Sequence, residues 1–296
     1  MSNHKQSFVA ASRVVQPASV ILVGALLLSA CGGGSSWATP SAPAPTAPAP
    51  VVNESLGGIW KSQYTVTSGT DNGDTINALA IATEQGDFVT IGKNANNGCA
   101  SVGFGQGSVS GTTVSATADW GVVQYTTIPG VATNCTEADG TTSGTTALTG
   151  TVAQRATLTL TGTDTTSAGT VYPATTTTWT YNSLYALTPS LSLIAGNYTD
   201  GSDTITISSN GAIFEQDPTT GCVINGQVAI PNASYNAYSF SITYGNCTGT
   251  NSALNGITAT GLGTYDNTVT PNEFDAGWHG IVNGQLYIYI GVFPKQ

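Results

Sequence analysis

A segment of about 130 residues occurs twice in this chain, and this repeat limits what the chain can fold into. TDNGDTI at 70–76 returns as TDGSDTI at 199–205, and each copy is followed by an apolar segment and then a glycine-led aromatic, Phe88 or Phe214. Three more matches follow in the same order: Gly98-Cys99 with Gly221-Cys222, Asn134-Cys135-Thr136 with Asn246-Cys247-Thr248, and ALTGT at 147–151 with ALNGI at 253–257. So long a period indicates a duplicated domain rather than a solenoid. We therefore expect two homologous β-domains, at 55–188 and 189–296.

Alternating side chains predict β-strands in both units. Residues 238–244 (YSFSITY) place rings and an isoleucine on one face and hydroxyls on the other, which is the period of a strand. Asn210-Gly211 and Asn283-Gly284 lie between such segments and favour hairpins. Residues 286–290 (LYIYI) are apolar on both faces, so this strand is expected to be covered twice or to pack on the other unit.

The strand count favours barrels. The second unit offers about eight short strands in meander order, and closing them into an up-and-down barrel removes exposed edges. We expect an all-β protein with two tandem small antiparallel β-barrels, and two β-sandwiches are the alternative. Gly58-Ile59-Trp60 resembles the G-x-W that opens strand one in lipocalins and other calycins, and Gly196-Asn197-Tyr198 is a weaker form. The resemblance implies lipocalin-like barrels, although the family's arginine is missing from the last strand and Arg155 lies one strand too early.

The cysteines divide evenly between the two units. Cys99 and Cys135 lie in the first, and Cys222 and Cys247 lie at equivalent places in the second. Four cysteines allow three pairings, and the repeat favours one disulfide inside each unit, Cys99–Cys135 and Cys222–Cys247. Export would make oxidation the expected state, and the absence of a CxxC motif disfavours a catalytic thiol pair.

The N-terminus predicts an exported protein. Lys5 and Arg13 precede an apolar stretch at 18–30, which as a helix of about 20 Å is too short to cross a bilayer. Leu28-Ser29-Ala30-Cys31 resembles the lipobox of bacterial lipoproteins. The resemblance implies a signal peptide at 1–30, cleavage before Cys31, and acyl chains such as palmitate on Cys31. Gly32 stands where an Asp would favour the inner membrane, so the resemblance favours the outer membrane.

A stalk is expected to follow the lipidated cysteine, at 31–54. Residues 38–50 read ATPSAPAPTAPAP, a composition that favours a polyproline II spacer. The exported part keeps four of the six basic residues and all 16 acids, so its net charge is 4 − 16 = −12. With no basic patch to meet phosphates, nucleic acid is excluded as a partner.

Few residues in the sequence indicate a catalytic or metal-binding site. The exported part has one histidine, His279, and neither HExxH nor G-x-S-x-G. The acid pairs Asp71 with Asp74 and Asp200 with Asp203 recur in Gly/Asn turns, so they are weak calcium candidates at most. Glu273 and Asp275 share one strand face, which we expect to be exposed to solvent.

These observations predict a non-enzymatic lipoprotein of the bacterial cell envelope, without a cofactor. It would be anchored through Cys31 and would bind an unidentified protein, a glycan or a small apolar ligand. Two alternatives remain: a periplasmic inhibitor of a cationic enzyme such as lysozyme, which the acidic charge would suit, and a hydrolase of cell-wall or sugar polymers, which would need a carboxylate pair in a cleft.

Overall fold

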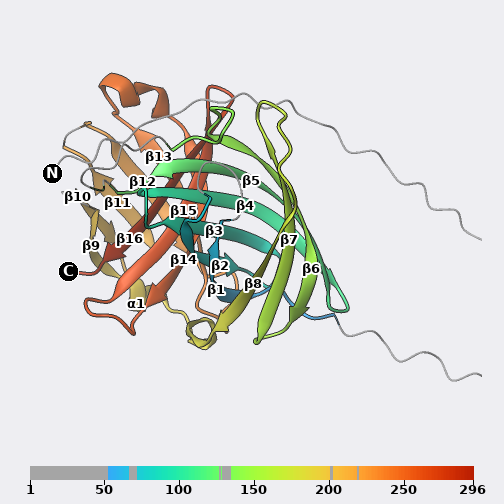
Figure 1. Cartoon of the computed structure of the whole chain (residues 1–296). Helices are drawn as coiled ribbons and strands as arrows, with labels where there is room; N and C mark the ends of the chain where they lie inside the picture. Colours follow the sequence, from blue (N-terminus) through green and yellow to red (C-terminus); the bar gives the residue numbers. More distant parts are fainter. Residues whose placement is uncertain (1–52, 67–71, 127, 129–134, 201–202, 219) are drawn as a thin grey trace, which may run out of the picture. The chain divides into compact units, whose positions relative to one another are not determined.

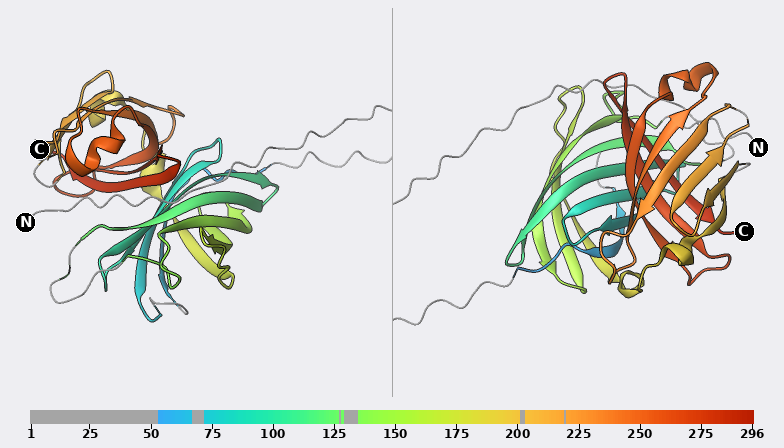
Figure 2. Two further views of the ribbon diagram at one scale, coloured as in Figure 1. Left: turned by 90° about the horizontal axis from the view of Figure 1, so that it is seen from above. Right: turned by 180° about the vertical axis from the view of Figure 1, so that it is seen from behind.

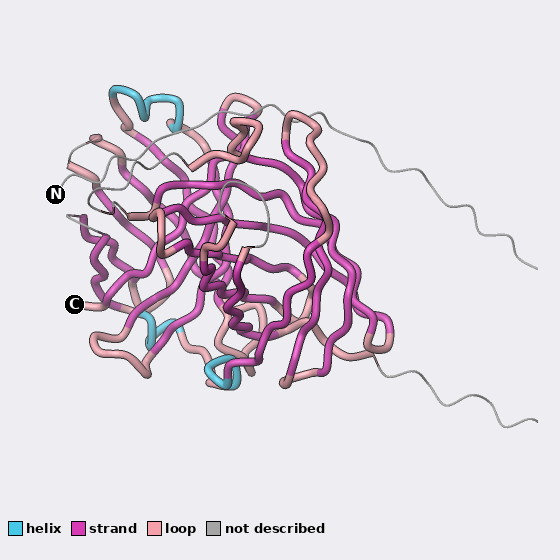
Figure 3. The backbone as a smooth tube through the Cα atoms, viewed as in Figure 1, coloured by secondary structure: helices cyan, strands magenta, loops and turns pink. Residues whose placement is uncertain are grey.

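The described part of the chain folds mainly as β-sheet, as its alternating apolar and hydroxyl-bearing residues predict (Figures 1 and 3). The computed structural model describes residues 53–66, 72–126, 128, 135–200, 203–218 and 220–296. Within this part of the chain, consecutive strands pair antiparallel in the order in which they occur. The predicted all-β class is confirmed, and the short helices lie in connections between strands.

The first eight strands close into a barrel. They are β1 (Gly58–Thr65), β2 (Thr75–Ala82), β3 (Asp87–Asn94), β4 (Cys99–Ser110), β5 (Thr113–Gln124), β6 (Ser143–Ala153), β7 (Thr157–Thr166) and β8 (Thr175–Asn182). Closure comes from three antiparallel residue pairs between β1 and β8, from Ile59 with Asn182 to Lys61 with Thr180.

The second eight strands form one sheet that curls into a barrel (Figure 2). They are β9 (Gly196–Asp200), β10 (Asp203–Ile207), β11 (Ala212–Gln216), β12 (Val223–Ala229), β13 (Tyr238–Gly245), β14 (Thr258–Asp266), β15 (Glu273–Val282) and β16 (Gln285–Pro294). The edge strands β9 and β16 meet at a bridge between Tyr198 and Lys295, beside which Gln296 N donates to Asn197 O at 2.8 Å. Two tandem barrels are thus confirmed, and the sandwich alternative is wrong because each set of strands forms a single sheet.

Short helical turns complete the connections. The 3-10 helix η1 (Ser183–Ala186) and the helix α1 (Leu191–Ile194) join the two barrels, and the 3-10 helix η2 (Gly249–Leu254) joins β13 to β14. In the part of the chain that the structure describes, no helix is long and apolar enough to cross a membrane.

The two barrels begin with the same aromatic anchor. Trp60 of β1 and Tyr198 of β9 are fully buried, at 0% and 1% exposure. The indole Nε1 of Trp60 donates to Leu56 O at 3.0 Å, and the hydroxyl of Tyr198 donates to Ile194 O at 2.6 Å. In each case the acceptor lies four residues earlier, so the G-x-W segment and its weaker G-x-Y copy take equivalent places.

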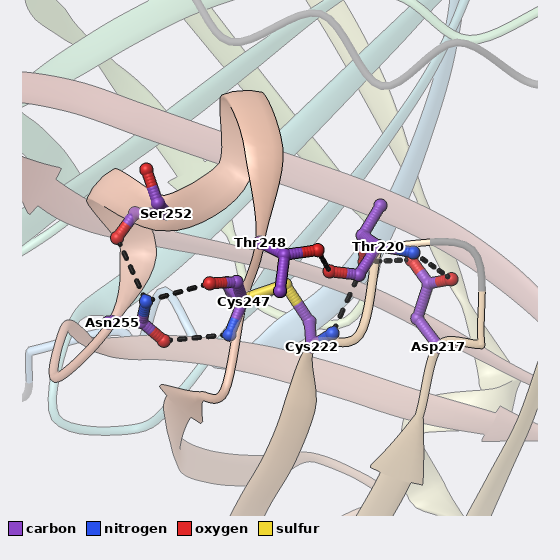
Figure 4. Close-up of a disulfide and its surroundings, with 7 residues drawn as sticks. All are labelled: Asp217, Thr220, Cys222, Cys247, Thr248, Ser252 and Asn255. Atoms are coloured by element: carbon purple, nitrogen blue, oxygen red, sulfur yellow. Dashed lines mark hydrogen bonds between the residues drawn. A yellow bond between two sulfur atoms is a disulfide. The ribbon is translucent and has the colours of Figure 1, made fainter.

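Both predicted disulfides are present, Cys99–Cys135 and Cys222–Cys247. Each joins the start of the fourth strand of its barrel to the loop after the fifth. Around the second bridge, Asn255 holds the backbone of Cys247 from both sides (Figure 4). Cys247 N donates to Asn255 Oδ1 at 2.7 Å, and Asn255 Nδ2 donates to Cys247 O at 2.9 Å.

Two of the sequence matches do not correspond in space. Phe88 packs inside the first barrel, but Phe214 is 47% exposed. Phe88 is two residues after the left-handed Gly86 and Phe214 three residues after the left-handed Gly211, and an offset of one residue moves a side chain to the other face. Likewise ALTGT lies within β6, whereas ALNGI lies in η2 and the turn before β14.

An apolar cluster joins the outer faces of the two barrels. Ile59, Val89 and Val102 of the first barrel are fully buried in a cluster that includes Leu262 and, more peripherally, Ile288 of the second. This contact explains the doubly apolar strand predicted at 286–290. Its tyrosines pack into the second barrel, and its isoleucines pack against the first.

His279 belongs to the same contact. It lies on the outer face of β15 and stacks on Phe104 of the first barrel, with ring centroids 4.4 Å apart. Burial lowers its pKa, and the carboxylate of Asp119 acts in the opposite direction. The histidine is therefore a packing residue between the barrels, in the middle of a strand.

The expectation that Glu273 and Asp275 face solvent is wrong for Asp275. The outward face of β15 turns toward the first barrel, and Oδ1 of Asp275 is buried with no hydrogen-bond partner among the described residues. Burial, followed by the charge of Glu273, raises the pKa of Asp275 to about 6, although Lys93 and Lys61 act against the shift. A strand pattern reports which residues share a face, but it does not report what covers that face.

We predict that Asp275→Asn stabilises the protein at neutral pH by about 2–3 kcal/mol. The folded carboxyl titrates near pH 6 and the unfolded one near 3.8. Between these values the folded state binds more protons, so the free energy of unfolding falls as pH rises. Urea unfolding from pH 4 to pH 8 should show this fall in the wild type and a weaker fall in the variant. The exposed Asp87→Asn serves as the control, and equal slopes in Asp275→Asn and the wild type would contradict the assignment.

Candidate functional site

The two barrel interiors differ because their inward-facing residues differ in size. Strand pairing places small residues on much of the inner wall of the first barrel. They are Ala78, Ala80, Ala82, Gly92, Gly103, Gly105, Gly107, Ala116, Ala118, Gly144, Gly150 and Gly162. Bulky side chains dominate the interior of the second barrel, among them Ile205, Ile207, Ile213, Ile224, Phe240, Ile242, Phe274, Trp278 and Phe293.

The second barrel is nearly filled by its own side chains. Its interior keeps a cavity of about 40 Å³, far smaller than the ~150 Å³ apolar cavity that accepts benzene. The carboxylate of Glu215, which is 3% exposed, lies in the cavity wall. Nearby, the indole Nε1 of Trp278 donates to the hydroxyl of Tyr244 at 2.7 Å, and burial raises the pKa of Tyr244. This interior has the packing of a structural core.

The first barrel is closed at one end by large buried side chains. Trp60, Phe88, Val152, Leu158 and Trp179 pack together there, each no more than 9% exposed. All five lie at the ends of strands that meet on this side of the barrel. They form a floor, and Leu56 covers it.

Solvent reaches the inner wall beyond this floor. Leu148 and Leu160 face inward and pack on the floor, yet both are only half-buried. The inward-facing Ala116, Thr146 and Asp164 are also half-buried. Inward-facing leucines stay accessible when the residues opposite them are too small to fill the interior. We call this accessible interior the lumen, and the end where β7 reaches Asp164 its mouth.

Polar groups gather at the mouth. Thr146 of β6 is the strand partner of Asp164 of β7, and its hydroxyl donates to the carboxylate. Burial raises the pKa of Asp164. Burial also raises the pKa of Tyr64 on β1, and the charge of Asp164 adds to that shift. Tyr64 therefore keeps its proton and can donate a hydrogen bond.

Trp120 supplies a further donor on the inner wall. It is 8% exposed, and its Nε1 is buried with no hydrogen-bond partner among the described residues. Gly144, its partner on β6, has no side chain, and the indole ring lies over it. An unpaired buried N–H costs about 1–3 kcal/mol, so a ligand acceptor that reached this donor on binding would be stabilised.

The structure describes three of the four predicted metal candidates. Asp71 lies outside the described residues, and Asp74 accepts a hydrogen bond from Asn94 Nδ2 at 2.8 Å. Asp200 and Asp203 pair across the β9–β10 hairpin through their backbones. Among the described residues, no group of three His, Cys, Asp or Glu side chains could hold a metal ion. The predicted lipid-bearing Cys31 also lies outside the described residues.

Sequence reasoning missed Asp164, Trp120 and Tyr64. In TLTLTGTDTT, Asp164 has the same parity as Leu158 and Leu160, so the alternation already placed an acid on the inner face. Trp120 likewise shares its parity with Val114 and Ala118. The signal in the sequence is a polar residue at a position where strand alternation places apolar side chains.

Comparison with known proteins adds no family to this description. The chain matches no protein-family model, and no curated protein is similar enough in sequence to serve as a relative.

We predict that the two interiors respond differently to added volume. Ala116→Leu, on the accessible wall of the first barrel, should lower the free energy of unfolding by less than about 1 kcal/mol. Ala259→Leu, at a position with 0% exposure in the core of the second barrel, should lower it by about 1–3 kcal/mol because that interior is already filled. Urea denaturation measures both values, and equal losses would show that the first barrel is packed like the second.

Proposed function

We propose that this protein is a non-enzymatic lipoprotein of the bacterial cell envelope that binds a small, partly apolar molecule in the lumen of its first barrel. The observation that carries the proposal is the contrast between the interiors. One barrel is filled, and the other has a closed floor, an accessible wall and polar groups at one end. A concave, mostly apolar site with a few convergent polar groups is the usual form of a small-molecule site.

The composition of the lumen suits such a ligand. The half-buried Leu148 and Leu160 offer apolar surface above the floor, while Asp164 and Trp120 supply a carboxylate and an N–H nearer the mouth. Asp164 is the one carboxylate among the inward-facing residues of β1 to β8, all of which are described. Glycoside hydrolysis normally uses two carboxylates about 5–10 Å apart, so the wall favours binding over this chemistry.

The N-terminal segment supports anchoring in the envelope. The lipobox-like residues 28–31 would place acyl chains on Cys31, and the proline-rich stretch at 38–50 would hold the barrels away from the lipid. The two disulfides are consistent with an oxidising compartment outside the cytoplasm. We place the protein at the outer membrane on the strength of Gly32.

Lipid attachment predicts a specific labelling result. Bacteria that express the full chain and are fed radioactive palmitate should incorporate label into the protein. Cys31→Ser should abolish the label and leave the signal peptide uncut, so the band should migrate more slowly. Cys99→Ser, which removes a disulfide cysteine, is the matched control and should keep the label. Label that persists in Cys31→Ser, or none in the wild type, would refute lipidation at this residue.

Lumen binding predicts saturable uptake of a neutral apolar dye. The full chain with Cys31→Ser, studied without detergent, should enhance Prodan fluorescence at one site. Leu160→Trp fills the lumen and should weaken this binding by at least about tenfold, since it removes the space for the dye. Thr159→Trp, the adjacent residue on the outer face, should bind as the wild type does. Circular dichroism checks that both variants fold, and equal binding by Leu160→Trp would remove the lumen as the site.

A further inference from the structure

We infer that the ligand of the first barrel carries a protonated amine, which binds to Asp164, and an oxygen acceptor, which binds to the indole N–H of Trp120. This inference rests on the proposed function and specifies the class of molecule that the lumen takes. It depends on two features of the described residues: a single charged side chain among the inward-facing strand residues, and a buried indole donor without a partner.

Asp164 is the one charged side chain among the inward-facing residues of β1 to β8. The charged residues on the neighbouring strands, such as Asp87, Lys93 and Asp119, have the opposite parity and lie on the outer face. The interaction that the structure gives Asp164 is the hydroxyl of Thr146, a neutral donor. A carboxylate can accept about four hydrogen bonds, so one neutral donor leaves most of this capacity for a ligand.

Burying a carboxylate without a countercharge is costly, so an incoming cation is favoured. A protonated amine supplies the charge and up to three N–H donors from a compact group. A divalent metal ion would instead require several oxygen ligands, and the inner wall offers one carboxylate. The net charge of −12 on the exported chain would also concentrate cations near the mouth.

Trp120 sets the second polar requirement. An indole Nε1 can only donate, so its partner on the ligand must be an acceptor such as a hydroxyl, ether or carbonyl oxygen. The strand partner of Trp120 is Gly144, and that of Asp164 is Thr146, two residues along β6. The two groups are thus separated by one strand and offset by two residues. A ligand that meets both groups must span this offset beside the indole ring, which covers Gly144.

The test compares three probes with the same six-carbon body: hexylamine, hexanol and hexanoate. Each is titrated by calorimetry into the full chain with Cys31→Ser at neutral pH, and each is also used to displace Prodan. We expect hexylamine to bind at least about tenfold more tightly than hexanol, and hexanoate to bind most weakly. Asp164→Asn should remove the preference for the amine and leave hexanol unchanged. Asp119→Asn, which removes a charge from the outer face at the same level of the barrel, should keep the preference.

The outcomes separate this inference from the proposed function. Equal binding of hexylamine and hexanol by the wild type, or an amine preference that survives in Asp164→Asn, overturns the inference and leaves lumen binding intact. If Prodan and all three probes fail to bind, lumen binding itself is refuted and the inference falls with it. If hexylamine binds by calorimetry and loses affinity in Asp164→Asn, the inference holds even where the larger dye does not enter.

The acceptor is tested separately with propoxyethylamine, which is hexylamine with one methylene replaced by an ether oxygen. We expect it to bind the wild type at least as tightly as hexylamine, despite its smaller apolar surface. Trp120→Phe keeps an aromatic ring but removes the N–H, so it should weaken propoxyethylamine more than hexylamine. Equal effects on the two probes would remove Trp120 from the inference.

Discussion

The alternation of side chains across a closed sheet controls every other property of this molecule. Once eight strands close into a barrel, each strand residue faces either the interior or the outside. The volume left inside then depends on the inward-facing side chains. The same strand order thus produces two different interiors here. Glycines and alanines leave the first accessible, and isoleucines and aromatic rings fill the second.

The two barrels share their strand order and disulfide positions, and they differ in the side chains that line their interiors. Trp60 and Tyr198 make the same hydrogen bond to a carbonyl four residues earlier, and each barrel has a disulfide at the same place in its strand order. These shared features hold the start of the first strand and the loop after the fifth. The inner wall is under a weaker constraint, because a barrel closes with either large or small residues inside. Divergence of the wall therefore changes the volume left inside while the architecture is retained.

The sequence predicts much of the barrel architecture and less of the candidate functional site. Period-two alternation, the repeat and the paired cysteines were sufficient for two barrels with internal disulfides. Phe214 shows the first limit. It lies one residue farther from its turn glycine than Phe88 does, and an offset of one residue moves a side chain to the other face of the strand. Asp275 shows the second, because what covers a face depends on the packing of the other barrel. Alternation alone could have identified Asp164, because its position in β7 places its side chain on the inward face of the barrel.

The accessible interior of the first barrel also suggests a structural role for the filled second barrel. A barrel that leaves its lumen open to solvent buries less apolar surface than a filled barrel, and apolar burial is the main favourable term in folding. The first barrel recovers part of this loss on its outer face. Ile59, Val89 and Val102 are fully buried there in the cluster that includes Leu262. The second barrel thus supplies apolar contact that the first lacks internally, and the lumen can stay open without loss of the fold.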